Sequence, residues 1–140
     1  MVAEAREIPI RDESDIVVAR SIAKTMAKEL GFSLVEQTKI ATVISELARN
    51  VVVHSMGEGV VNIRKLPTKD AESEMIMNGL EIITSDNGIG ITDIATAQTD
   101  GYTSGGGLGL GLGGARRLMD EFELESQPGK GTTICVRKWI

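Results

Sequence analysis

The stretch that decides the fold runs from Asp86 to Gly114 and reads DNGIGITDIATAQTDGYTSGGGLGLGLGG. Ten of the 16 glycines in the chain lie in it. Their spacing indicates two uses: a tight turn at Gly88 and Gly90 after a strand, and a loop at Gly105 to Gly111 that opens a helix. Backbone amide groups and the positive end of a following helix can together hold a polyphosphate. The stretch therefore predicts a phosphate-binding loop.

The glycine run does not match either of the common phosphate-binding motifs. It has no Lys followed by Ser or Thr, as a P-loop requires, and no βαβ unit of about 30 residues surrounds it, as a dinucleotide-binding fold requires. A flexible linker is the simple alternative. Leu108, Leu110 and Leu112, which alternate with the glycines, favour a packed loop that binds a ligand.

Asp86 ends a predicted strand, and Gly88 and Gly90 follow it at alternate positions. A carboxylate there can accept a hydrogen bond from an exocyclic amine such as that of adenine, and the glycines let the backbone pass close to a purine. The alternative is an Asp-Asn-Gly turn, which needs no ligand. That turn explains Gly88 well and Gly90 less well.

Glu46 and Asn50 are four residues apart in a segment with helical spacing, so they share one helix face. In phosphoryl transfer the amide oxygen of Asn50 could bind Mg2+, and the Glu46 carboxylate could polarise the attacking hydroxyl or water. Glu and Asn at this spacing are also common on solvated helix faces. Without further signals, the plain surface interpretation of this pair is favoured.

Composition narrows the class of protein. The 140 residues fit one domain, residues 1–140, and a net charge of -5 makes binding to nucleic acid a poor hypothesis. Protein or small-molecule partners suit the acidic balance better. Cys135 is the single cysteine, and no apolar run approaches the roughly 20 residues of a membrane span. We expect a cytoplasmic protein that neither enters a membrane nor binds nucleic acid.

The remaining segments predict a two-layer α/β (α+β) sandwich with a mostly antiparallel sheet and helices on one face. Pro9 restricts the first strand, within residues 2–10, to a sheet edge. Helices are predicted from Asp12 to Gly31, after a capping box at Ser33–Glu36, and over Leu108–Asp120, with a further helical turn or two at Thr92–Ala97. Strands are predicted at residues 60–66, 79–85, 122–126 and 132–140, paired as hairpins.

Taken together, the motifs resemble those of a known superfamily. Glu46–Asn50 (ELARN) resembles the N box, Asp86–Gly90 (DNGIG) the first glycine box and Gly105–Gly111 (GGGLGLG) the second glycine box of the GHKL, or Bergerat-fold, ATPases. Gly129-Lys130-Gly131-Thr132 follows in the expected order. Within the superfamily, the chain is similar to the RsbT-type serine/threonine kinases of the bacterial stressosome, relatives of anti-sigma-factor kinases. That likeness rests on Asp15–Val17, Ala27–Phe32, Ile44–Asn50, Thr103–Gly106, Arg117–Phe122 and Lys138-Trp139.

The resemblance implies a role for each matching residue. Glu46 would be the general base, Asn50 the Mg2+ ligand, and Asp86 the partner of the adenine amine, with Thr132 assisting through a water. The glycines and leucines of the two glycine boxes would shape the adenine floor and the phosphate loop; they are Gly88, Gly90, Gly105, Gly106, Gly107, Leu108, Gly109, Leu110 and Gly111. Residues 91–104 would form an ATP lid without Lys or Arg, so we expect slow intrinsic ATP hydrolysis.

The resemblance also implies partners. Kinases of this type use Mg-ATP to phosphorylate a STAS-domain regulator in partner switching, and some bind and activate a phosphatase or act on another sigma-regulatory partner. The alternative is a nucleotide-gated anti-sigma or adaptor module that acts by binding without obligatory catalysis. Glu46 favours the kinase, because a pure binder has no use for that carboxylate. A detached histidine-kinase ATPase domain is disfavoured, since no phosphoacceptor helix precedes the N box.

Overall fold

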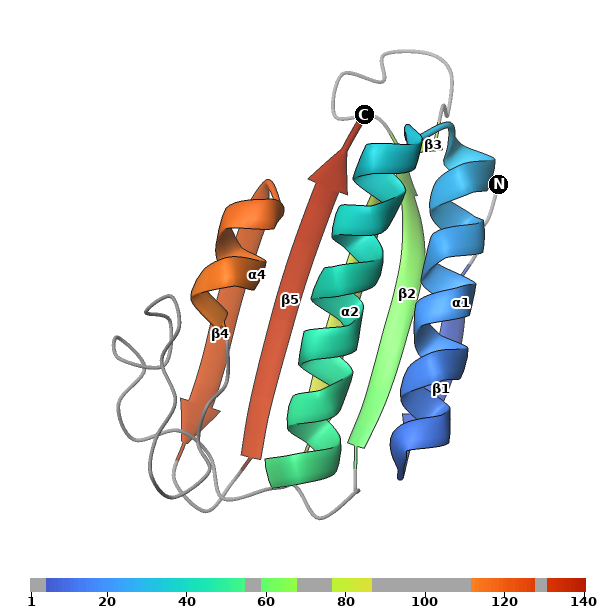
Figure 1. The fold of residues 1–140 in the computed structure, drawn as a ribbon. Coiled ribbons are helices and arrows are strands. Elements are labelled where there is room, and N and C mark those ends of the chain that lie inside the picture. The colour runs from blue at the N-terminus through green and yellow to red at the C-terminus, as the bar shows by residue number, and fades with distance from the viewer. Residues whose placement is uncertain (1–4, 55–58, 68–76, 87–111, 128–130) are drawn as a thin grey trace.

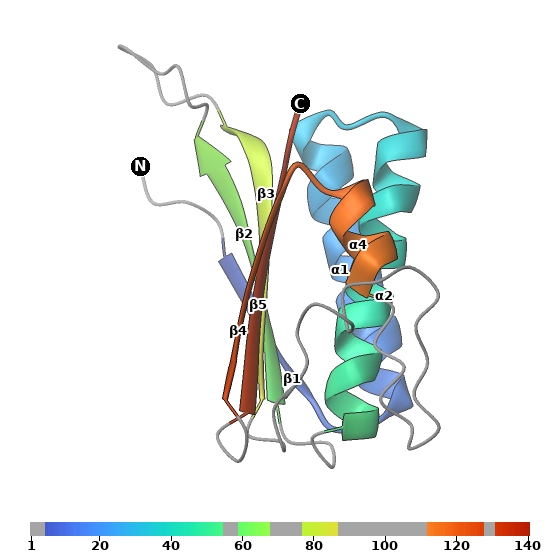
Figure 2. The same cartoon turned by 90° about the vertical axis from the view of Figure 1, so that its left-hand side faces the viewer.

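In the computed structural model, residues 5–54, 59–67, 77–86, 112–127 and 131–140 are described, and they form two layers (Figure 1). Figure 2 shows the helices of this part of the chain on one face of the sheet. The elements in chain order are β1 (Ala5–Ile10), α1 (Glu13–Leu30), α2 (Leu34–His54), β2 (Gly59–Pro67), β3 (Met77–Asp86), α4 (Leu112–Leu118), β4 (Glu121–Gln127) and β5 (Gly131–Trp139). The predicted two-layer sandwich is confirmed.

The five strands form one sheet in the order β1-β2-β3-β5-β4, and each of the four pairings is antiparallel. β1 lies at an edge, where Pro9 pairs with Val60. That position is the one predicted from Pro9, which lacks the N–H that a central strand needs. The predicted hairpins are also present, as β2 with β3 and β4 with β5.

α1 begins and ends as its sequence predicts. The Asp12 carboxylate accepts hydrogen bonds from the backbone N–H of Ser14 at 2.9 Å and of Asp15 at 3.4 Å. The hydrogen bond from the Ser14 hydroxyl, together with these two, lowers the pKa of Asp12. Gly31 ends the helix with φ +99°, a conformation that glycine adopts without a Cβ penalty.

α2 follows after a short turn, and its predicted capping box forms only in part. The backbone N–H of Glu36 donates to the Ser33 hydroxyl at 3.2 Å, as predicted. The Glu36 carboxylate, however, contacts lysines: Oε1 lies 3.3 Å from Lys39 Nζ and Oε2 lies 2.9 Å from Lys138 Nζ. The helix start is therefore joined to β5 through Glu36. The helix ends at His54.

The prediction of a long third helix over Leu108–Asp120 was wrong at its C-terminal end. The structure describes α4 only at Leu112–Leu118, and residues 108–111 lie outside the described part of the chain. By Asp120 the backbone already belongs to the sheet region, because its N–H donates to the Arg137 carbonyl at 3.0 Å and its carboxylate accepts from the Trp139 N–H at 2.7 Å. The predicted helical turns at Thr92–Ala97 also lie outside the described residues.

The core between the layers is mainly aliphatic, in keeping with a sequence of which only 3% is aromatic. Six residues of α2 at helical spacing are at most 1% exposed: Ile40, Val43, Ile44, Leu47, Ala48 and Val51. They pack in one hydrophobic cluster that includes Leu80, Ile82, Ile134 and Val136 of the sheet. Because this stripe fixes the rotation of α2, it also decides which side chains of the helix face outward.

Candidate active site

The first part of the candidate site is the outward side of α2. Glu46 and Asn50 lie one turn apart on this helix, and the Glu46 side chain is 42% exposed while Asn50 is half-buried. Arg49 Nη1 lies 3.8 Å from Glu46 Oε1, with the Arg49 side chain 47% exposed. A pair as exposed as this is worth little in stability. The Glu46 carboxylate is therefore positioned by the helix and remains accessible from solvent.

The second part lies at one end of two neighbouring interior strands, where β3 ends and β5 begins. Asp86 pairs directly with Thr132 of β5 on one side and with Gly59 of β2 on the other. Side chains two residues apart in a strand point to the same face, and Thr84, two residues before Asp86, is buried at 3% exposure. Asp86 and Thr132 therefore share the helix-facing side of the sheet. The structure brings together the two residues assigned to adenine by resemblance.

Gly59 joins these two parts. A Cβ atom built on Gly59 would lie 2.5 Å from Val51 Cγ1 of α2 and 3.2 Å from Asp86 Cβ. Val51 follows Asn50 directly, so the last turns of α2 and the end of β3 meet at this glycine. Only a residue without a side chain permits this approach. Gly59 was not singled out as a site residue from the sequence, because nothing local distinguishes it from a turn glycine.

Ser126 of β4 orients the Thr132 hydroxyl. Their oxygen atoms lie 2.8 Å apart, and Ser126 Oγ also lies 3.2 Å from the Gly131 carbonyl oxygen. When Ser126 donates to that carbonyl, Thr132 is the donor in the hydroxyl pair, and the Thr132 oxygen can accept from a water. Sequence reasoning missed Ser126. The sequence did contain one indication of its position. In the alternating pattern of the last hairpin, Ser126 falls on the same face as Phe122 and Leu124.

α4 is the third described element next to the candidate site. Leu112 is fully buried, Ala115 is 3% exposed, and the helix packs against α2. Leu112 follows directly on Gly111, so α4 fixes where the predicted phosphate loop ends. The predicted site residues Gly88, Gly90, Gly105, Gly106, Gly107, Leu108, Gly109, Leu110 and Gly111, and the predicted lid at residues 91–104, lie outside the described residues.

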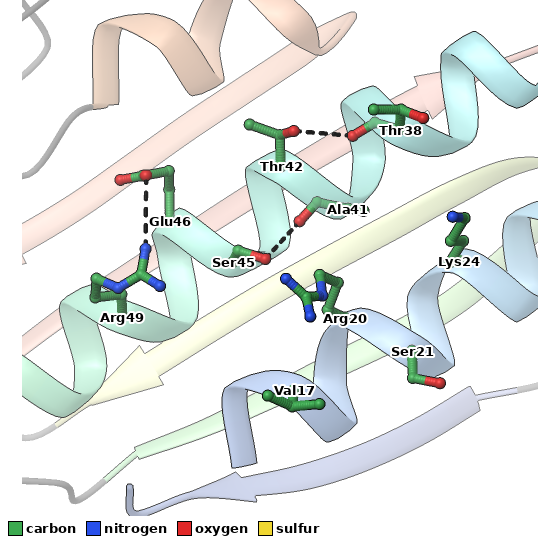
Figure 3. Close-up of a pocket in the computed structure, with 10 residues that line it drawn as sticks. All are labelled: Val17, Arg20, Ser21, Lys24, Thr38, Ala41, Thr42, Ser45, Glu46 and Arg49. Atoms are coloured by element: carbon green, nitrogen blue, oxygen red, sulfur yellow. Dashed lines mark hydrogen bonds and ion pairs between the residues drawn. The ribbon is translucent and has the colours of Figure 1, made fainter. Parts of the chain in front are cut away.

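A groove of about 750 Å³ runs along the outer side of α1 and α2 (Figure 3). Glu46 lines it, together with three cationic side chains: Arg20 and Lys24 from α1 and Arg49 from α2. Hydroxyl groups contribute the rest of its polar surface, from Ser21, Thr38, Thr42 and Ser45. Thr38, Thr42 and Ser45 donate to backbone carbonyls one turn earlier in their own helix. The cations are therefore the groups best placed to attract a partner.

Comparison with known proteins identifies the family. The family model "Histidine kinase-, DNA gyrase B-, and HSP90-like ATPase" matches residues 35–139. The chain belongs to this family. It is 45% identical over 133 residues to the serine/threonine-protein kinase RsbT of Bacillus subtilis, covering 95% of each chain. It is 32% identical over 123 residues to an anti-sigma F factor of Clostridium novyi, covering 86% of this chain and 82% of that one. The predicted GHKL membership and RsbT-type likeness are confirmed.

Solved structures agree on the fold. The histidine kinase domain of the Erythrobacter litoralis blue-light activated kinase superposes with a TM-score of 0.55 at 18% identity, covering 88% of this chain and 59% of that chain. The catalytic domain of the histidine kinase ThkA gives a TM-score of 0.54 at 12% identity, covering 99% of this chain and 96% of that one. At such identities the likeness concerns architecture. It supports the two-layer fold described above.

Two properties of the described residues concern other classes of site. No helix in this part of the chain is both long and apolar enough to cross a membrane. Among the same residues, no cluster of three or more His, Cys, Asp or Glu side chains is arranged to hold a metal ion. Mg2+ bound to phosphates usually takes most of its ligands from the nucleotide and water, and few from the protein. A single amide oxygen, such as that of Asn50, fits this requirement.

Proposed function

We propose that this protein transfers the γ-phosphoryl group of Mg-ATP to a Ser or Thr of a STAS-domain regulator, in a bacterial partner-switching pathway of the stressosome type that controls a sigma factor. It then binds and activates a downstream phosphatase. The observation that carries the proposal is the 45% identity to RsbT over 95% of both chains. A cytoplasmic location follows from such partners.

The chain is a protein serine/threonine kinase. RsbT carries that name, and the match extends over nearly the whole of both proteins. The anti-sigma F factors, at 30% to 32% identity, support a place among partner-switching regulators. That the substrate is a STAS-domain protein, and that the kinase activates a phosphatase, are our proposals.

In the proposed reaction the adenine end of ATP lies at Asp86 and Thr132. The Asp86 carboxylate accepts a hydrogen bond from the adenine amine, and Thr132, oriented by Ser126, assists through a water. Gly88, Gly90 and the glycines from Gly105 to Gly111 take the floor and phosphate roles. Their support is the family match, which includes all of them. Asn50 holds Mg2+, which neutralises charge on the phosphates when it is bound.

Glu46 accepts the proton of the substrate hydroxyl in the proposed transfer. The hydroxyl oxygen then forms a bond to the γ-phosphorus while the bond to the β-γ bridging oxygen breaks, and ADP leaves. Support comes from the position of Glu46 on α2, one turn before Asn50 and open to solvent. Since the Glu46 carboxylate is also reachable from the groove between α1 and α2, we place the docked regulator there. Arg20, Lys24 and Arg49 suit an acidic surface on that partner.

The test is a transfer assay with γ-labelled ATP, Mg2+ and candidate STAS-domain proteins. Wild type is expected to label a partner, and Glu46→Ala to lower the rate by roughly 10² to 10⁴, the usual contribution of general base catalysis. Glu29→Ala is a matched control, because Glu29 is a carboxylate of similar exposure, 51%, on the neighbouring helix. Equal transfer by Glu46→Ala and wild type would remove the general-base role.

Nucleotide binding tests the adenine assignment separately. Asp86→Asn replaces a pure acceptor with a group that also donates, so ATP affinity is expected to fall while the circular dichroism spectrum stays unchanged. Unchanged affinity would remove Asp86 from this role. The isolated protein is also expected to hydrolyse ATP slowly, because the predicted lid at residues 91–104 contains no Lys or Arg. Rapid hydrolysis without a partner would contradict the dependence on docking.

A second candidate function is supported by the anti-sigma F factor relatives. In it, nucleotide binding gates the capture of a sigma factor or other regulator, and phosphoryl transfer is not required. A pull-down of candidate partners by Glu46→Ala in the presence of ATP separates the two. If Glu46→Ala captures the partner and still regulates the sigma factor fully, binding is the function. If the variant captures the partner but no longer regulates the sigma factor, catalysis is the function.

A further inference from the structure

Lys138 is a buried cation that connects three elements. It lies near the end of β5, two residues after the fully buried Val136, and its side chain is 8% exposed. Its ammonium group donates a hydrogen bond to the Leu118 carbonyl at 2.9 Å, at the C-terminal end of α4. The same nitrogen lies 2.9 Å from Glu36 Oε2, in the first turn of α2. One side chain thus joins β5, α4 and α2.

A lysine at this position needs a reason beyond packing. Its place in the alternation of β5 would suit an aliphatic residue, and a buried ammonium group is costly unless it is paired and hydrogen-bonded. The two partners of Lys138 that offset this cost both lie at helix ends, the Leu118 carbonyl at the end of α4 and the Glu36 carboxylate at the start of α2. A cation suits the C-terminal carbonyls of α4, and an anion suits the first turn of α2.

The two helices do not depend equally on this contact. α2 has 21 residues and a continuous buried stripe, so it is fixed in place without Lys138. The structure describes seven residues of α4, too few for a helix to be stable on its own. Its position rests on the buried side chains of Leu112, Ala115 and Met119, on the hydrogen bonds that join Asp120 to β5, and on the Lys138 contact with its last carbonyl group. Loss of the Lys138 contact should therefore shift the C-terminal end of α4 and leave α2 where it is.

We propose that Lys138 is a positioning residue for ATP, acting on the triphosphate end of the nucleotide through α4. This inference rests on the proposed function, which assigns the phosphates to the glycines that directly precede Leu112. Lys138 holds the far end of α4 and so sets where the chain enters the helix. The adenine end depends on Asp86 and Thr132, which belong to β3 and β5. Lys138 should therefore matter for ATP and not for adenosine.

Lys138→Met tests the proposal, with Lys65→Met as the matched control. Lys65 of β2 makes an equivalent bridge from sheet to helix, since its Nζ lies 3.0 Å from Glu29 Oε1 of α1 and its side chain is 13% exposed. Calorimetric titrations with ATP and with adenosine, and steady-state transfer kinetics, are measured for each. Lys138→Met is expected to raise the Kd and KM for ATP roughly tenfold, because ATP must then hold α4 without the hydrogen bond from the charged Lys138 to Leu118, and such a bond is of about that magnitude. Adenosine affinity and kcat at saturating ATP should not change.

Lys138→Arg keeps a cationic donor and is expected to restore most of the ATP affinity. The proposal is overturned if Lys138→Met binds ATP as wild type does, if it loses adenosine affinity by the same factor, or if Lys65→Met has an equal effect. If Lys138→Met does not fold, the same comparison is made with Lys138→Gln and Lys65→Gln, and the same outcomes decide. Failure of the wild type to bind ATP at all would instead refute the proposed function.

Discussion

Gly59 offers the sharpest test of the site geometry, through the substitution Gly59→Ala. The added Cβ would lie 2.5 Å from Val51 Cγ1 and 2.7 Å from the Ser85 carbonyl oxygen. Val51 is 1% exposed and β-branched, so its side chain has little freedom to rotate away. The Ser85 oxygen belongs to the backbone and moves only with β3. Relief of the clash must therefore shift the end of β3, which carries Asp86.

The size of the effect follows from these distances. Carbon atoms in contact prefer about 3.5–4.0 Å, so Val51 Cγ1 must move roughly 1–1.5 Å away from the new methyl group. Overpacking of this kind costs about 1–3 kcal/mol of the free energy of unfolding. Because Asp86 moves with the strand and Asn50 with the helix, the affinity for ATP should fall as well. A misplaced hydrogen bond to a charged group corresponds to a loss of roughly tenfold.

Gly79→Ala provides the matched control at the other end of β3. Its added Cβ would lie 2.6 Å from two ring carbons of Trp139 and 3.2 Å from Leu66 Cβ, so it too is overpacked. Urea unfolding is expected to show reduced stability for both variants, and titration calorimetry to show weaker ATP binding only for Gly59→Ala. If Gly59→Ala is destabilised but binds ATP like wild type, or if both variants lose affinity equally, the placement of the adenine site at this junction is refuted.

Three further substitutions test the helices. The hydrogen bond from Lys138, with a smaller contribution from Lys39, lowers the pKa of Glu36 below its usual 4.5. Its contribution to stability is therefore complete above that value and is lost as the pH falls through the lowered pKa, so Glu36→Gln should flatten the acid side of the stability profile measured by urea unfolding. Gly31→Ala should destabilise by about 1 kcal/mol, since φ there is +99°. Gly114→Ala in α4, whose new Cβ would meet no atom within 4 Å, should stabilise by about 0.5–1 kcal/mol in thermal unfolding. The opposite sign in either glycine variant would contradict the helix assignments.

Local chemistry made much of the fold predictable. Asp12 marks the start of α1 because its side chain accepts hydrogen bonds from the first backbone N–H groups of the helix. Gly31 marks the end because that position takes the left-handed conformation, which glycine favours. Pro9 indicated an edge strand for the equally local reason that it lacks a backbone donor. The alternation of residues 122–126 and 132–140 gave the last hairpin, since its strands are adjacent in the chain.

Contacts between distant segments could not be predicted in the same way. The C-terminal end of α4 was placed too late, because Asp120 bonds to Arg137 and Trp139 of β5 and no pattern near Asp120 reveals this. Three residues have roles that depend on partners on other elements: Gly59, Ser126 and Lys138. Their neighbours in the sequence indicate only a turn glycine, a strand residue and a residue near a strand end. For the candidate site, spacing gave the shared face of Glu46 and Asn50, whereas the pairing of Asp86 with Thr132 required the strand register.

The exposure of Glu46 bears on why a kinase of this form should need its partner. At 42% exposure, beside a similarly exposed Arg49, the carboxylate is surrounded by water that weakens its electrostatic interactions. In the proposed reaction, a regulator docked in the groove between α1 and α2 would displace that water and put a hydroxyl in its place. Exclusion of water also strengthens the electrostatic interactions that remain in the site. The open groove would thus make the substrate a structural part of the active site, which is the physical reason to expect slow hydrolysis by the isolated protein.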